Sequence, residues 1–415
     1  MKGSCEEYMN IILIGKNKAF IDEFCTMPEI NSVIIIECKK VYNNLEEYEI
    51  DLNHKLIYCD YVNNDRFLEE IIPYIATSKI DGVIPGFEYS VPAANELAEY
   101  LCLPCVGKKG ASIFSNKIKF REFSKNTNLN HPKFIKIKSI IDLNTFFDGK
   151  KIILKPSNRQ ASIGLYIISS KDELKEAFTD ALIMKNEKTV DEDRLEWEYM
   201  AEEFLSGYEM SSEYLVKDGK IVFKNITYKE GIDNQECIEI AHHIPAIKNV
   251  EVEKEMYNQI NKLIEKANIG TTVLHAEWKV EKNIPVLIEC AARMPGDYIS
   301  NGISSSYNFN FRRAYINLMI DVPFEINKIF QRYTIIQFFY TEKIGILAEV
   351  ENLNLMHEHK EYILSYKVTK EIGAFVKPPD SSWDRLGYFI IKSERYKDLL
   401  FKRDYLLNNI KFSIV

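Results

Sequence analysis

The segment 271–297, TTVLHAEWKVEKNIPVLIECAARMPGD, constrains the fold more than any other part of the chain. Polar and apolar residues alternate in its first half, which is typical of a strand with one buried face. The buried face would carry Leu274, Ala276, Trp278 and Val280, and the polar face His275, Glu277 and Lys279. Residues 281–285 are expected to form a short turn before a second strand over 286–290. The segment therefore predicts an antiparallel β-hairpin.

The predicted hairpin brings two carboxylates together. A turn centred on Asn283 pairs Glu277 with Glu289. Opposed β-carbons lie roughly 4.5–5.5 Å apart, and like charges at that spacing destabilise a sheet unless positive charge lies between them. Mg²⁺ binds carboxylate oxygens and usually shares its coordination with substrate phosphates, so the pair predicts a magnesium site beside a nucleotide. Arg293, on the same face, would reach an anionic substrate or the transferring phosphoryl group.

Two alternatives remain open for these carboxylates. Glu277 could pair with Lys279 and Glu289 with Arg293 at a solvated surface, where such ion pairs have no function. A register shift of one residue would also move one carboxylate to the opposite face of the hairpin.

The first 110 residues alternate short apolar strands with helical stretches. This order is typical of an α/β unit with a parallel sheet. The expected strands are 11–14, 33–36, 56–58 and 82–85, and the expected helices are 65–76 and 91–101. Gly15 follows the first strand without the other glycines of a dinucleotide-binding G-x-G-x-x-G motif, so a nicotinamide oxidoreductase is disfavoured.

Length, charge and cysteine usage exclude several classes of protein. A chain of 415 residues is expected to form several lobes. The net charge of -8 argues against nucleic-acid or membrane-surface binding, and no apolar run reaches the roughly 20 residues of a membrane span. We therefore expect a cytoplasmic protein whose eight cysteines are reduced. Cys102 and Cys105 have C-x-x-C spacing, but no second pair completes a zinc site.

Two further segments could bind a nucleotide. In KIILKPSNRQASIG, strand 152–154 leads into Lys155 and a polar loop that contains Ser162 and Gly164, and Lys117 lies in a preceding basic helix. Amides, hydroxyls and cations in such a loop suit polyphosphate oxygens, although an ordinary surface hairpin is the alternative. The charged run 185–198 is expected to be an exposed loop.

The segment AEEFLSGYEMSSE offers groups for a nucleoside. Unpaired backbone at Phe204 and Leu205 could hydrogen-bond an adenine edge, and Glu209 could accept from ribose hydroxyls. His242 and His243, before Pro245, could equally be core or rim residues.

These motifs together resemble the ATP-grasp superfamily. Lys117, ILKPSNRQASIG, AEEFLSGYEMSSE, HAEWK and IECAARMPGD occur in the family order with family-like spacing over most of the chain. The run from Ala292 to Ile299 and the tail FVKPPDSSWDRLGYFIIKSE are most similar to the L-amino acid ligases (dipeptide synthetases), which have a biotin carboxylase-like core. The resemblance implies a carboxylate-amine ligase that forms an amide through an acyl phosphate and releases ADP and phosphate.

The resemblance also implies roles for individual residues, with ATP and Mg²⁺ as cofactors and Mn²⁺ as an alternative metal. The implied ATP-binding residues are Lys117, Lys155, Ser162, Gly164, Glu202, Glu203, Phe204, Leu205 and Glu209. Glu277 and Glu289 match the metal ligands, and Arg293, Glu289 and His242 match catalytic positions. Two departures are Ala291, where the family usually has a metal-binding asparagine, and the glycine-poor phosphate loop.

The implied fold is an α/β ATP-grasp fold, with α+β character in the central lobe. The expected parts are a Rossmann-like pre-ATP-grasp domain (1–112), linker helices with the small lobe (113–200), the large lobe with the metal site (201–325) and a C-terminal α/β subdomain (326–415). Expected partners are a small-molecule carboxylate and amine, with no nucleic acid and no membrane. A homodimer, a ligase that loads a carrier protein, and a non-catalytic nucleotide-binding homologue remain alternatives.

Overall fold

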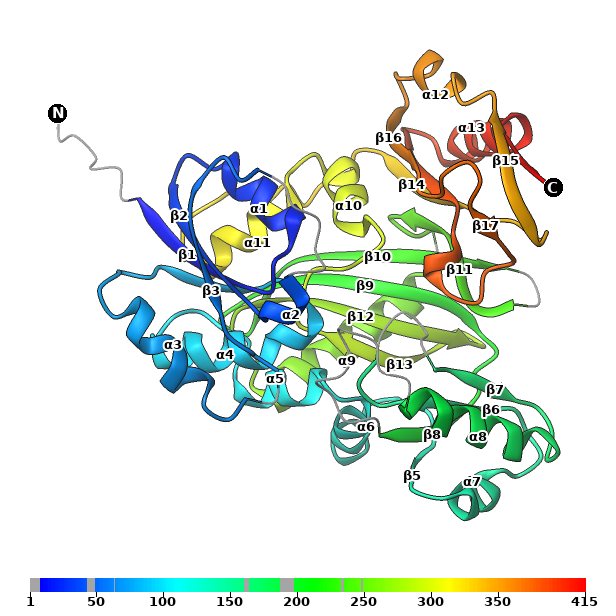
Figure 1. Ribbon diagram of the computed structural model, residues 1–415, viewed down its shortest axis with the longest axis horizontal. Coiled ribbons are helices and arrows are strands. Elements are labelled where there is room, and N and C mark those ends of the chain that lie inside the picture. Colours follow the sequence, from blue (N-terminus) through cyan, green and yellow to red (C-terminus); the bar gives the residue numbers. More distant parts are fainter. Residues whose placement is uncertain are drawn as a thin grey trace.

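Four β-sheets organise the protein in a computed structural model that describes residues 8–42, 49–62, 64–159, 164–186, 198–232, 235–247 and 249–415. Figure 1 shows the N-terminal sheet on the left, the long central sheet in the middle and a small sheet at the lower right. The C-terminal segment lies above β11 at the upper right. No described helix is both long and apolar enough to cross a membrane.

The N-terminal sheet is parallel, as the alternation of apolar strands and helices predicts, with the order β3-β2-β1-β4. Its strands are β1 (Met9–Ile14), β2 (Ile30–Glu37), β3 (Asn53–Tyr58) and β4 (Gly82–Pro85). Helices α1 (Lys18–Cys25), α2 (Lys39–Tyr42), α3 (Phe67–Ile75) and α4 (Val91–Tyr100) connect them, with the short 3₁₀ helix η1 (Glu88–Ser90) before α4. Both faces are buried, because successive residues of β1 enter two different apolar clusters.

The small sheet has the order β5-β8-β6-β7 and is antiparallel. Helices α5 (Lys108–Phe114) and α6 (Lys117–Asn126) lead into it from the N-terminal unit. It contains β5 (Phe134–Ile137), β6 (Ile152–Pro156), β7 (Tyr166–Ile168) and β8 (Tyr199–Glu203), packed with α7 (Ile140–Phe146) and α8 (Glu173–Asn186). The strand-loop-strand hairpin predicted around Lys155 is confirmed as β6 and β7. The charged run predicted after α8 lies largely outside the described residues.

The central sheet has eight strands in the order β13-β12-β9-β10-β11-β14-β18-β16. Its first five strands are β9 (Tyr208–Lys217), β10 (Lys220–Ile232), β11 (Gln235–Ile244), β12 (Thr272–Glu281) and β13 (Ile284–Ala291). Helix α9 (Val250–Ala267) packs its buried residues against the apolar side of β12 in one cluster that includes Trp278. This arrangement confirms the two-faced strand predicted for the segment around Glu277.

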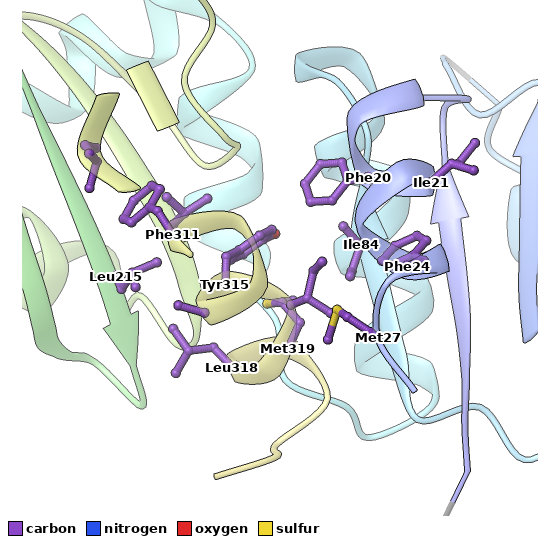
Figure 2. Packing of buried hydrophobic residues seen from close by; sticks show 14 of the residues in the cluster. Phe20, Ile21, Phe24, Met27, Ile84, Leu215, Phe311, Tyr315, Leu318 and Met319 are labelled. Atoms are coloured by element: carbon purple, nitrogen blue, oxygen red, sulfur yellow. The ribbon is translucent and has the colours of Figure 1, made fainter. Parts of the chain in front are cut away.

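Helices α10 (Ile299–Tyr307) and α11 (Phe311–Met319) lie on the opposite face of the central sheet. Figure 2 shows Phe311, Tyr315 and Met319 of α11 between Leu215 of the central sheet and Phe20 and Phe24 of α1. One apolar cluster therefore joins the N-terminal unit to the central sheet.

The C-terminal segment, residues 333–415, continues the central sheet. Its strand β14 (Tyr333–Phe339) pairs with β11, and β18 (Gly387–Ser393) and β16 (Ile363–Val368) follow outward. A separate three-stranded sheet has the order β17-β15-β19, and the remaining elements are β15 (Gly345–Glu351), α12 (Leu355–Glu358), β17 (Phe375–Val376), η2 (Ser382–Asp384), α13 (Tyr396–Asn409) and β19 (Lys411–Ile414). The tail has the α/β composition expected from the sequence, but three of its strands extend the sheet of the central lobe.

Candidate active site

The β12–β13 hairpin places Glu277 directly opposite Glu289, as the alternation of the sequence predicts. Both side chains line the same cavity and are about one-quarter exposed, at 28% and 23%. The one-residue register shift that would separate them is not observed.

The predicted turn was wrong in detail. The turn has only two residues, Lys282 and Asn283, both with positive φ (51° and 63°), and β13 already begins at Ile284. Such a turn alone would pair Glu277 with Ile288. A β-bulge skips Ile288, because Trp278 pairs with Leu287 while Glu277 pairs with Glu289. The extra residue therefore restores the facing carboxylates.

Each of the two carboxylates contacts a lysine. Lys229 Nζ of β10 lies 2.5 Å from Glu277 and 3.1 Å from both Glu209 and Glu239. Lys117 Nζ lies 2.9 Å from Glu289. The lysines supply the positive charge that the opposed carboxylates require.

The surface ion pairs considered as an alternative are not formed. Lys279 contacts Glu209 at 3.2 Å instead of Glu277. Arg293 Nε contacts Glu88 Oε2 at 2.8 Å instead of Glu289.

Burial and charge shift the pKa values around Lys229 strongly. Burial alone would lower the pKa of Lys229, but attraction to Glu277, Glu239 and Glu209 holds it well above its usual value. Burial likewise would raise the pKa of the Glu277 carboxyl, but Lys229 and His275 hold it well below its usual value. These groups are therefore charged at neutral pH and form an ionic network, because both shifts favour the charged forms.

Through Glu88 of η1, the N-terminal unit contacts this site. The contact of Glu88 with Arg293 joins two segments that are 205 residues apart. Burial raises the pKa of the Glu88 carboxyl, an effect that attraction to Arg293 opposes. Arg293 also donates from Nη1 to the carbonyl of Met294 at 2.9 Å, while its Nη2 has no hydrogen bond with the described residues.

A second ionic cluster lies where the small sheet meets the central sheet. Glu202 of β8, only 2% exposed, contacts Arg121 at 2.7 Å and also pairs with Lys155 of β6. Arg121 also donates to the carbonyl of Ile288, the bulged residue of β13. Although burial alone would raise the pKa of Glu202, attraction to Arg121 and Lys155 lowers it. The cluster connects the predicted adenine-binding strand with the hairpin that carries Glu289.

One prediction for the adenine-binding segment was wrong. The backbone of Phe204 is not free, because its N–H donates to the carbonyl of Lys151 at 3.1 Å. Leu205 N–H makes no hydrogen bond with the described residues, and β8 ends at Glu203. Leu205 is therefore the residue of this pair whose amide remains for a ligand.

A single cavity of about 390 Å³ joins most residues predicted from the sequence. Those that line it are Lys117, Lys155, Glu202, Glu203, Phe204, Leu205, Glu209, His242, Glu277, Glu289 and Arg293. Gly164, with a φ of 68°, is not among the lining residues. Ser162 lies outside the described residues.

Charged residues that the sequence did not single out surround His242: Asp297 and Glu239 line the cavity, and Arg385 contacts both. His242 Nε2 lies 3.1 Å from Asp297 Oδ2, and Arg385 Nη1 contacts the same oxygen at 2.9 Å. Arg385 Nη2 lies 3.3 Å from Glu239 Oε2. Although burial alone would raise the pKa of Asp297, His242 and Arg385 hold it well below its usual value. His242 is fully buried, and its Nδ1 has no hydrogen-bond partner among the described residues.

The residues present fit a nucleotide with a divalent cation. Oxygen ligands from two adjacent strands face one cavity, which is the ligand type that Mg²⁺ prefers. Lysines and an arginine lie beside them, as polyphosphate oxygens require. Ile153, Pro156 and Leu165 supply apolar lining near the segment with the free Leu205 amide.

Two family models match the chain. Residues 149–301 match the ATP-grasp domain, and residues 337–415 match the L-amino acid ligase C-terminal domain 2. Comparison with curated proteins finds no match.

Solved structures share this fold. An L-amino acid ligase from Bacillus licheniformis superposes with a TM-score of 0.80 at 18% identity, covering 99% of each chain. A phosphoribosylglycinamide synthetase from Anaerococcus prevotii gives 0.69 at 16% identity, covering 98% of this chain and 100% of that one. The biotin carboxylase domain of a Hydrogenobacter thermophilus 2-oxoglutarate carboxylase, solved with MgADP, gives 0.67 at 12% identity, covering 98% and 91%. The chain has an α/β ATP-grasp fold in which an ATP-grasp domain is joined to an L-amino acid ligase C-terminal domain, which confirms the resemblance drawn from its motifs.

Proposed function

We propose that this protein is an ATP-dependent ligase that joins a small carboxylate, such as an amino acid, to an amine. The observation that carries the proposal is the position of Glu277 and Glu289. They face each other in the cavity that also contains Arg293 and the segment from Glu202 to Leu205. A cation-binding carboxylate pair, a guanidinium and a nucleoside-binding segment in one cavity suit phosphoryl transfer to a carboxylate.

The proposal assigns each part of ATP to particular residues of the cavity and the adjoining loop. Lys117 and Lys155 would contact phosphate oxygens, and Ser162 and Gly164 belong to the loop that would cover them. Leu205 and the adjoining residues Glu202, Glu203 and Phe204 would border the adenine, and Glu209 would accept from the ribose hydroxyls. Lys155 pairs with Glu202 and Lys229 pairs with Glu209, so these ion pairs already fix the positions of groups that would bind the nucleotide.

Glu277 and Glu289 would hold Mg²⁺, with Mn²⁺ as an alternative. When bound, the ion neutralises charge on the phosphate oxygens. Ala291 follows Glu289 by two residues and offers no side-chain ligand, so these two carboxylates would be the protein's contribution from the hairpin.

The first chemical step would form an acyl phosphate. A carboxylate oxygen of the substrate attacks the γ-phosphorus of ATP, and the bond from that phosphorus to the bridging oxygen breaks to release ADP. Nη2 of Arg293, which makes no hydrogen bond with the described residues, and the ammonium of Lys117 would stabilise charge on the transferring group.

The second step would form the amide. The amine nitrogen attacks the acyl carbon, the carbon–oxygen bond to phosphate breaks, and the nitrogen loses a proton. Arg293 would stabilise the tetrahedral adduct, and His242, held by Asp297, would orient the substrate in the cavity. Exclusion of water by the loop around Ser162 would prevent hydrolysis of the acyl phosphate.

The domain division expected from the sequence is part of the same proposal. The N-terminal sheet lies within 1–112 and the small sheet spans 134–203, and residues of the small sheet, the central sheet and the C-terminal segment line the cavity.

The proposal is tested by measuring ADP release with pairs of amino acids and other small carboxylates and amines, with mass spectrometry of the products. We expect ADP release that depends on both substrates and yields their amide. Glu289→Gln should reduce the rate by at least about a hundredfold, because it removes one cation ligand and its charge. Glu281→Gln is the matched control, since Glu281 is exposed at the end of β12, the other strand of the hairpin.

Full activity of the Glu289→Gln variant would contradict the proposal. ATP binding without turnover for any pair would favour a non-catalytic nucleotide-binding protein instead. Turnover only with a carrier protein would favour the carrier-loading alternative.

A further inference from the structure

The C-terminal segment contributes residues to the cavity. Ser382 and Trp383, from the short helix η2, line it together with Arg293 and Asp297. Trp383 is 73% exposed, although an indole is one of the largest apolar side chains. An exposed aromatic ring on a cavity wall is a contact surface for an apolar group of a ligand.

Arg385 fixes this wall to the central sheet. It is 6% exposed, and its guanidinium donates to Asp297 at 2.9 Å and to the carbonyl of Glu239 at 2.8 Å. The guanidinium carbon also lies 3.8 Å from the ring centroid of Phe338. These contacts connect Trp383, two residues earlier, with Asp297, four residues after Arg293.

The backbone around Trp383 is also held. Ser381 Oγ accepts from the N–H of Trp383 at 3.3 Å, and Asp384 accepts from the N–H of Ser381 at 3.0 Å. The ammonium of Lys370 donates to the carbonyl of Trp383 at 2.9 Å. The indole is therefore presented from a fixed turn, which lowers the entropy cost of binding a ligand against it.

The charged groups closest to η2 in this part of the structure already form ion pairs. Arg385 is balanced by Asp297 and Glu239, and Lys229 is surrounded by three carboxylates. An acidic substrate side chain would lose its hydration without gaining a countercharge, and a basic one would have to share carboxylates that Lys229 and Arg385 already contact. An apolar side chain has no such cost and would cover the exposed indole.

We propose that Trp383 is a specificity-determining residue that forms the wall of a substrate subsite for an apolar side chain. This inference rests on the proposed ligase function and adds the class of amino acid to it: the enzyme takes apolar amino acids in preference to acidic or basic ones at this subsite. Arg385 is a positioning residue, because it holds the wall through Asp297 and Glu239.

The first test measures binding without turnover. Apolar amino acids (leucine, phenylalanine) and charged ones (glutamate, lysine) are added to the full-length protein with Mg²⁺ and ADP while tryptophan fluorescence is recorded. Ligands that cover the indole of Trp383 should change the tryptophan emission. Of the other two tryptophans, Trp278 is fully buried and Trp197 lies outside the described residues, so loss of the change in Trp383→Phe would assign it to Trp383. Charged amino acids should produce no such change.

The second test measures specificity. Trp383→Ala should raise the KM for apolar amino acids by about tenfold or more, in the range expected when a pocket loses apolar contacts, with the KM for ATP unchanged. Trp383→Phe should keep the KM for apolar amino acids close to that of the wild type, because phenylalanine retains an aromatic ring at the subsite. A merely structural role of Trp383 would not explain this difference between the two variants. Phe401→Ala is the matched control, because Phe401 is an equally exposed aromatic residue of the same segment that does not line the cavity.

The outcomes separate the two proposals. If the wild type joins amino acids but Trp383→Ala keeps the same KM values, or if glutamate or lysine is preferred, the subsite inference is wrong while the ligase proposal stands. If the wild type joins nothing and no amino acid changes the fluorescence of Trp383, both fail. If apolar amino acids change that fluorescence without turnover, the subsite is supported and the ligase proposal fails.

Discussion

Replacement of Lys229 by methionine should destabilise the protein severely. The ammonium of Lys229 lies within 2.5–3.1 Å of Glu209, Glu239 and Glu277, whose carboxylate oxygens all lie within 4.8 Å of one another. The side chain is 4% exposed, so water cannot replace its charge. Methionine keeps much of the side-chain length and removes the charge together with the three hydrogen bonds that the ammonium donates.

The magnitude follows from these contacts. At an effective dielectric constant of about 20, two unit charges about 4 Å apart attract by about 4 kcal/mol. Three such contacts would exceed 10 kcal/mol, but the desolvation of the buried ammonium offsets most of this sum. Removal of one partner from a buried ionic cluster costs about 3–5 kcal/mol. We expect Lys229→Met to lower the free energy of unfolding by that amount.

The loss should depend on pH in a defined direction. Without Lys229 the carboxylates repel one another, which raises a carboxyl pKa in the folded state above its unfolded value. The stability contributed by such a group is present below the unfolded pKa and is lost as pH rises through the folded pKa. The deficit relative to wild type should therefore grow from about pH 5 to pH 8.

Urea unfolding in the presence of a metal chelator, followed by circular dichroism and fluorescence at both pH values, measures these differences. Lys217→Met is the matched control, since Lys217 lies at the end of β9 and its partner Asp321 is 69% exposed. It should change the unfolding free energy by less than about 1 kcal/mol. A Lys229→Met variant as stable as that control at pH 8 would refute the reasoning.

Three further changes probe the framework of the site. Arg121→Met should destabilise by about 3 kcal/mol in urea unfolding, because Glu202 loses a buried partner at 2.7 Å; a loss below 1 kcal/mol would contradict this assignment. Trp278→Phe should cost about 1–3 kcal/mol by the same measurement, since Ser212 loses the buried hydrogen bond that it accepts at 2.8 Å, and an unchanged stability would argue against that bond. Lys282→Asn should raise the free energy of unfolding by up to about 1 kcal/mol, and the thermal midpoint with it, because asparagine tolerates the positive φ of this turn better than lysine. A destabilised variant would show that the turn has another conformation.

Local patterns in the sequence predicted the hairpin, but not the bulge that makes its two carboxylates face each other. The alternation around Glu277 sets which side chains share a face, and a short turn brings the second strand back beside the first. The bulge at Ile288 could not be predicted, because the segment contains no glycine or other local signal for it. The predicted five-residue turn is longer than the two-residue turn observed, and the predicted pairing is correct only because the bulge shifts it by one residue.

The contacts made by distant segments were not predictable from local patterns. Lys229 gathers carboxylates from β9, β11 and β12, which are separated by up to 68 residues along the chain. The pairing of β11 with β14 joins strands about 90 residues apart, and Arg385 contacts Asp297, which lies 88 residues earlier in the chain. Likewise, the bond from Phe204 to Lys151 joins segments of two strands, so the sequence alone suggested a free amide. The local sequence around a lysine or arginine does not indicate which carboxylate will be its partner in the folded protein.

The central claim, transfer of phosphate to a substrate carboxylate, has a direct isotopic test. An amino acid carrying ¹⁸O in both carboxylate oxygens is incubated with the enzyme, Mg²⁺, ATP and an amine, and the released phosphate is analysed by mass spectrometry. If an acyl phosphate forms, breakage of its carbon–oxygen bond leaves one ¹⁸O atom in each phosphate and one in the amide product. Phosphate without ¹⁸O, released while the missing label appears in AMP or in water, or released with no amide at all, would contradict the account.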